Sequence, residues 1–119
     1  MISVGLETLL DLDGHVLVQD HGCWVKIEAR VVEVDENRPH GIKYSLTLHA
    51  PDGERLLGYH NAHGLPGRGE RQAPGKLPYD HCHGYGRLQP TRYEYSSPEA
   101  LLKDFFAEVD RVLREVLQP

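Results

Sequence analysis

The sequence contains little cysteine, no long apolar run and no basic leader, and each absence excludes a class of protein. Its two cysteines, Cys23 and Cys82, are too few and too far apart along the chain for a disulfide framework. No apolar stretch approaches the roughly 18 residues that a membrane span requires. Residues 1–12 carry acidic but no basic side chains, which argues against a secretory signal. We therefore expect a cytoplasmic protein with reduced thiols and no membrane segment.

Length and composition predict one globular domain over residues 1–119, because 39% of the residues are hydrophobic and 26% are charged. The net charge of −5 disfavours a generic nucleic-acid coat protein. The charge is uneven, however, since residues 38–92 hold eight basic and four acidic side chains and six of the eight histidines. An anionic ligand is therefore expected to bind this histidine-rich middle region. The alternative is that loops simply collect solvated charges.

Alternation of apolar and polar residues predicts an antiparallel sheet. Residues 25–31 and 42–49 alternate with a period of two, as half-buried strands do. Residues 50–53, Ala-Pro-Asp-Gly, favour a turn, after which residues 54–61 return as the partner strand of a hairpin. Residues 15–18 form a shorter β-prone run that follows an Asp-Gly turn.

The remainder of the chain predicts a long loop and then a helix. Residues 63–92 are dense in glycine and proline and show no periodicity, and residues 93–95 offer one more short strand. Ser97 and Pro98 are typical of a helix N-cap and first helical position, and apolar residues at steps of three and four continue through residues 101–116. The predicted fold is therefore α+β: a small antiparallel sheet of three to four strands packed by one long C-terminal helix, with a Gly/Pro-rich loop at about 63–92.

Three short histidine-containing clusters, at residues 40–44, 60–63 and 80–83, are the candidates for chemistry. In an extended segment His81 and His83 would point to the same side. Paired imidazoles suit proton transfer near neutral pH, and imidazole is also a common zinc ligand. The cysteine and histidine spacing matches no zinc finger.

The order of these motifs resembles the TumE-like toxins of bacterial toxin–antitoxin operons, over about residues 24–113. The matching motifs are His40-Gly41-Ile42-Lys43-Tyr44, Gly58-Tyr59-His60-Asn61, His63-Gly64, Asp80-His81-Cys82-His83 and a helix start at residues 97–105. Three departures accompany them. Ser45 stands where the family pattern has arginine, His60 stands where it has aspartate, and residues 65–79 form an insertion.

The resemblance implies a toxin that is held inactive by a cognate antitoxin, typically a helix-turn-helix protein. For the reaction we favour metal-independent cleavage of RNA without a cofactor. His81 and His83 are expected to transfer protons, Asp80 to orient one of them, and Lys43 and Arg87 to stabilise the transition state. The full expected site comprises the catalytic residues His81, His83, Lys43, His63 and Asp80 and the substrate-binding residues His40, Asn61, Tyr44 and Arg87.

Other interpretations are left open by the sequence. The chain is also compatible with a non-catalytic module that inhibits growth by occupying a partner, or with a transferase that modifies RNA or nucleotides. His63, His81 and His83 with Asp80 would alternatively suit a catalytic zinc ion. Neither the oligomeric state nor the role of residues 1–23 follows from the pattern, and a homo-oligomer is compatible with it.

Overall fold

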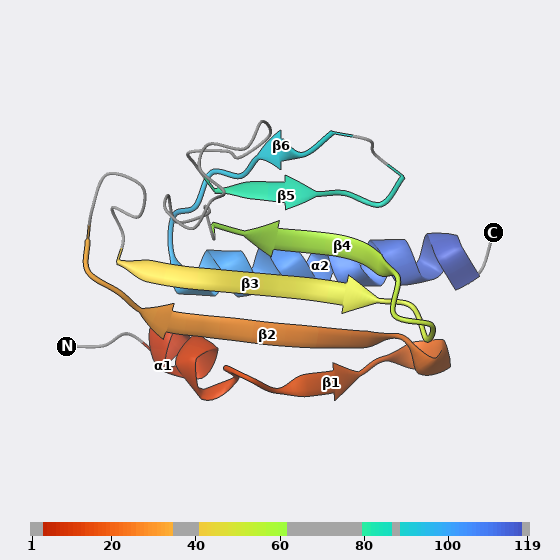
Figure 1. Cartoon of the computed structure of the whole chain (residues 1–119), viewed down its shortest axis with the longest axis horizontal. Helices are drawn as coiled ribbons and strands as arrows, with labels where there is room; N and C mark the ends of the chain where they lie inside the picture. Colours follow the sequence, from red (N-terminus) through yellow and green to blue (C-terminus); the bar gives the residue numbers. More distant parts are fainter. Residues whose placement is uncertain (1–3, 35–40, 62–79, 87–88, 118–119) are drawn as a thin grey trace, which may run out of the picture.

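The structure, a computed structural model, describes residues 4–34, 41–61, 80–86 and 89–117. The described strands form a six-stranded antiparallel sheet in which each strand pairs with the next one in the sequence. Two helices lie on one side of this sheet, and α2 crosses behind β3 and β4 (Figure 1). The elements are α1 (Val4–Asp11), β1 (Val16–Val18), the 3₁₀ turn η1 (Asp20–Gly22), β2 (Trp24–Val31), β3 (Ile42–His49), β4 (Arg55–His60), β5 (His81–His83), β6 (Thr91–Arg92) and α2 (Pro98–Leu117).

The core lies between the two helices and one face of the sheet. Strands β2 and β3 pair over eight residues, so that Val25 lies opposite Leu48 and Ile27 lies opposite Leu46. Because alternate side chains point to opposite faces, every second residue of these strands is buried, except Val31 at the end of β2. The α+β fold and the strands predicted over residues 25–31, 42–49 and 54–61 are confirmed. The buried apolar residues of the sheet face are Val25, Ile27, Ala29, Ile42, Tyr44, Leu46, Leu48, Leu57 and Tyr59.

Helix α2 begins as its sequence predicts. The Oγ atom of Ser97 accepts a hydrogen bond from the backbone N–H of Ala100 at 3.0 Å, which caps the first turn. The apolar stripe of the helix then packs on the sheet, where the Phe105 ring is fully buried and meets the Tyr59 ring edge-on at a centroid distance of 5.8 Å. Helix α1 packs beside it, since the backbone N–H of Gly5 donates to the carboxylate of Glu99.

The described sheet has six strands, whereas three to four were expected. Strands β5 and β6 lie within residues 63–92, which were predicted to be loop, and the last strand is Thr91–Arg92 rather than residues 93–95. Strands of two or three residues are too short to show periodicity, and β5 exists because it pairs with β4. Helix α1 was not predicted either. The part of the expected loop at residues 62–79 lies outside the described residues.

Among the described helices, none is long and apolar enough to cross a membrane.

Replacing Phe105 by alanine tests the packing of α2. Because Phe105 is fully buried against the sheet, we expect the free energy of unfolding to fall by about 3–5 kcal/mol, measured by urea denaturation. Phe106→Ala is the matched control, because the neighbouring Phe106 ring is only half-buried, and a clearly smaller loss is expected. Equal stability of the Phe105→Ala variant and the unaltered protein would contradict this packing.

Candidate functional site

Three histidines gather on the face of the sheet that lies opposite the helices, here called the outer face. Strand β4 alternates so that Tyr59 faces the helices and His60 faces outward. Strand β5 pairs with it in a register that places His81 beside His60 and His83 beside Gly58. Cross-strand partners point to the same side of a sheet, so both histidines of β5 join His60. These three residues are called the histidine cluster below.

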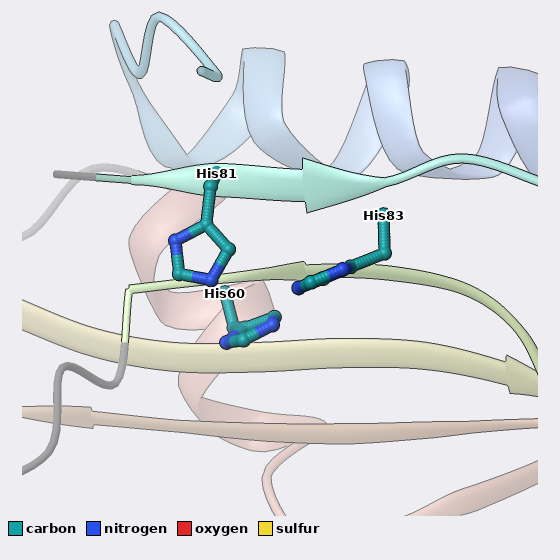
Figure 2. A group of neighbouring side chains, drawn as sticks. All are labelled: His60, His81 and His83. Atoms are coloured by element: carbon teal, nitrogen blue, oxygen red, sulfur yellow. The ribbon is translucent and has the colours of Figure 1, made fainter. Parts of the chain in front are cut away.

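The three imidazole rings of the cluster are in close contact. The ring centroids of His60 and His81 are 4.1 Å apart, those of His60 and His83 are 4.9 Å apart, and those of His81 and His83 are 5.2 Å apart. One nitrogen from each ring lies within 4.8 Å of the others. Figure 2 shows the His81 and His83 rings extending from β5 toward the His60 ring. The arrangement suits either proton transfer within one substrate or the binding of one metal ion.

Burial and charge favour a neutral imidazole in the cluster. His81 is only 6% exposed, and His60 and His83 are half-buried. Burial lowers the pKa of His83, and electrostatic repulsion from Arg55 and His81 lowers it further. A neutral imidazole keeps a nitrogen lone pair, which can accept a proton or bind a metal. His83 is therefore suited to act as an acceptor at neutral pH.

Lys43 lies on the same face, beside a surface depression of about 530 Å³. Its cross-strand partner is Arg30, so two cations stand next to each other at this end of β2 and β3. Ser45 also lines the depression and is the direct partner of His60, which brings the depression up to the histidine cluster. Asp13 and Glu28 also line the depression and balance the two cations in formal charge, so an anionic ligand beside the imidazoles would have to contact Lys43 or Arg30 directly.

Arg55 is a further cation at the cluster, and the sequence reasoning missed it. A Cβ atom built on Gly58 would lie 3.4 Å from the Arg55 Cδ atom, so the exposed arginine side chain runs over this glycine. Gly58 is the cross-strand partner of His83, and the charge of Arg55 acts on the His83 ring. The alternation of β4 could not indicate this contact, because a β-bulge between Leu48 and His49 shifts the register beside Arg55.

Asn61 and Tyr44, which were expected to bind substrate, hold strands together instead. The Asn61 side chain accepts a hydrogen bond from the Tyr44 backbone N–H at 2.9 Å and donates one to the Ile42 carbonyl at 2.7 Å. Both residues are almost completely buried. The amide thus continues the hydrogen bonding of β3 beyond the end of β4, away from the outer face.

Asp80 is likewise separated from the histidines that it was expected to orient. It immediately precedes His81, so alternation places its side chain on the helix side of the sheet. There its Oδ2 atom accepts a hydrogen bond from the Tyr44 hydroxyl at 2.9 Å. Burial and the Asp80 carboxylate raise the pKa of Tyr44, which keeps its hydroxyl a proton donor.

The structure thus divides the expected site into three groups. Lys43, His81 and His83 lie on the outer face, whereas Tyr44, Asn61 and Asp80 lie behind it. His40, His63 and Arg87 lie outside the described residues. His60 belongs to the cluster although the sequence assigned it no role. The alternation of residues 54–61 put it on the opposite side from Asn61, but nothing local showed that β5 would pair beside it.

Asn61→Ala tests the structural role of the buried amide. The substitution leaves the Tyr44 N–H and the Ile42 carbonyl without their side-chain partner, and we expect a loss of about 1–3 kcal/mol of unfolding free energy. The neighbouring His60→Ala variant is the control, because it removes a half-buried side chain from the outer face of the same strand. The melting temperatures of the two variants are compared. If Asn61→Ala melts no earlier than His60→Ala, the structural role assigned to the Asn61 amide is contradicted.

Comparison with known proteins identifies a family for this chain. The chain has no significant match among curated proteins or solved structures. The model of the family described as Toxin TumE matches residues 16–113, which include all six strands and most of α2. Since this match extends over most of its length, the chain belongs to the toxin TumE family.

Proposed function

We propose that this toxin cleaves RNA on the outer face of its sheet, with the histidine cluster transferring the protons and without a metal ion. The observation that carries the proposal is the convergence of three imidazoles beside a depression whose lining includes the cations Lys43 and Arg30 together with the acids Asp13 and Glu28. The pairing of imidazoles and cations on one surface suits a phosphodiester substrate, which is anionic and needs two proton transfers during cleavage.

The reaction needs one proton acceptor and one proton donor. His83 accepts the proton of a ribose 2′-hydroxyl, whose oxygen then attacks the adjacent phosphorus. His81 donates a proton to the 5′-oxygen that leaves, so that a cyclic phosphate and a free 5′-hydroxyl are produced. The lowered pKa of His83 suits the acceptor role. His60 lies against both rings and helps to position them.

Cations stabilise the charge that develops on the phosphorus oxygens. Lys43 approaches from the depression, and Arg55 lies on the side of His83. Both are carried by strands of the sheet, and cations beside the reacting phosphate stabilise the negative charge that develops on it. Arg87, for which the same role was expected, lies outside the described residues and stays a prediction.

A toxin family implies an antitoxin partner, and we propose that this partner is a helix-turn-helix protein. The resemblance noted from the sequence supports the choice. The proposed target is RNA in the cytoplasm, and two other functions remain as outcomes of the experiment below: a binding module without chemistry, and a transferase acting on RNA or nucleotides.

Variants of the two proton-transfer residues test the ribonuclease proposal. We expect His81→Ala and His83→Ala each to slow RNA cleavage by about 10²–10⁴-fold and to relieve growth arrest when expressed without the antitoxin. His49→Ala is the matched control, since His49 lies on the same face but its ring nitrogens contact the Gly53 carbonyl and the Thr47 hydroxyl. The cleavage assay uses total RNA and EDTA-treated protein, with melting curves to confirm folding.

The results of these assays distinguish the ribonuclease from a binding module and from a transferase. Growth arrest by both folded variants at matched protein levels would remove these histidines from the site. Arrest by the unaltered protein without RNA cleavage or loss of RNA length would identify a binding module or a transferase, and mass spectrometry of the RNA then distinguishes these two.

Arg55→Ala tests the contact between this cation and the substrate phosphate. A hydrogen bond to a charged group contributes roughly 1.5–3 kcal/mol, so we expect kcat/KM for a short RNA to fall about tenfold or more. Arg55→Lys keeps the charge and should recover part of the loss. Arg114→Ala, an exposed position on α2, serves as the control. An unchanged kcat/KM in Arg55→Ala would show that the arginine does not contact the substrate.

A further inference from the structure

We infer that the histidine cluster binds one transition-metal ion of the zinc class, with His60, His81 and His83 each supplying one nitrogen. The inference stands on the geometry of the three imidazoles. Only the effect of the ion on RNA cleavage rests on the proposed function.

The spacing of the three side chains is that of a preformed ligand set. His81 and His83 occupy alternate positions of β5 and so share a face, and His60 is the direct partner of His81 on β4. Their nitrogens already lie within 4.8 Å of one another. Zinc–nitrogen bonds of about 2.0–2.1 Å in a tetrahedral site place ligand nitrogens roughly 3.4 Å apart. The atoms must therefore approach one another by roughly an ångström, which side-chain rotation can supply.

The sheet orders the ligands before any ion binds. All three histidines belong to paired strands, so the conformational entropy of their backbone is already lost on folding. This removes an objection that arises from the sequence, in which His81 and His83 would have come from a long loop. The observed positions in β4 and β5 make ion binding a matter of side-chain adjustment alone.

The donor atoms select the class of ion. Three imidazole nitrogens suit zinc, cobalt, nickel or copper, whereas magnesium and calcium require oxygen ligands. The neighbouring carboxylate of Asp80 is on the opposite face and bonded to Tyr44. The sulfur of Cys82 is also on that side, 3.1 Å from the Thr91 hydroxyl. Among the described residues, the ligands of this site are therefore the three imidazole nitrogens.

Three protein ligands leave one tetrahedral position for water or a phosphate oxygen. The side chain of Arg55 lies over Gly58, the cross-strand partner of His83, and so adjoins this position. The positive charge of Arg55 acts on His83 and opposes a bound cation, so removing it should not weaken metal binding. A variant of Arg55 therefore distinguishes RNA cleavage from metal binding, because the arginine charge attracts a substrate phosphate and repels a metal cation.

A bound ion has a definite effect on the proposed reaction. An imidazole nitrogen that ligates zinc has no lone pair left to accept a proton, and it cannot donate one. Zinc at the cluster therefore inhibits metal-free RNA cleavage, and one ion per chain suffices.

The test is a titration of the chelator-treated full chain with cobalt(II) and zinc(II). We expect one ion per chain, a cobalt absorption band typical of four-coordinate nitrogen ligation, and no displacement by excess magnesium. His60→Ala and His83→Ala should each weaken binding by more than about tenfold. His49→Ala and Cys82→Ser are controls and should bind as the unaltered protein does, and Arg55→Ala should bind at least as tightly.

Several results would overturn the inference. The first is that no stoichiometric metal binding is found. The second is that the folded His60→Ala and His83→Ala variants bind metal as tightly as the unaltered protein. The third is that His63→Ala weakens metal binding whereas His60→Ala does not. Cleavage is then measured with and without one equivalent of zinc. Binding with inhibition supports both proposals, whereas binding with activation supports the metal site and overturns the metal-independent mechanism. Cleavage without any zinc binding overturns this inference alone.

Discussion

The register between β3, β4 and β5 is the constraint on which the rest of this structure depends. Strand residues alternate between faces, so a slip of one position would exchange His60 with Asn61 and would turn the cluster into the core. The buried Asn61 amide prevents such a slip, because it bonds to backbone groups of Tyr44 and Ile42. The residue that fixes the strand register, Asn61, is therefore the direct neighbour of a residue of the histidine cluster, His60. Both keep their positions only while β3 and β4 stay in this register.

Cations on the outer face of the sheet offer contacts to the anionic substrate that we propose for this acidic chain. The outer face presents Arg30, Lys43 and Arg55 near the histidines, and the acids Asp13 and Glu28 also line the depression there. Helix α2, on the other side, carries more acidic than basic residues. Electrostatic attraction acts over about a Debye length, roughly 8 Å at physiological salt, so the local surface decides what approaches the cluster. The net charge of −5 describes the whole chain and not this surface.

Two departures from the toxin pattern turn out to be neighbours in space. Ser45 replaces an arginine of that pattern and His60 replaces an aspartate, and the two are direct cross-strand partners in β3 and β4. In this chain His60 places a third imidazole beside His81.

The sequence by itself determined the elements whose patterns are long enough to be periodic. The alternation of residues 25–31 and 42–49 and the cap at Ser97 predicted β2, β3 and α2, because burial of one face imposes its period on every such element. The side shared by His81 and His83 followed from the same rule. Only the tertiary structure decided that His60 joins them and that Asp80 does not. Strand β5 has three residues and pairs with residues of β4 that lie 21 to 25 positions earlier, and no local propensity encodes a contact between segments so far apart.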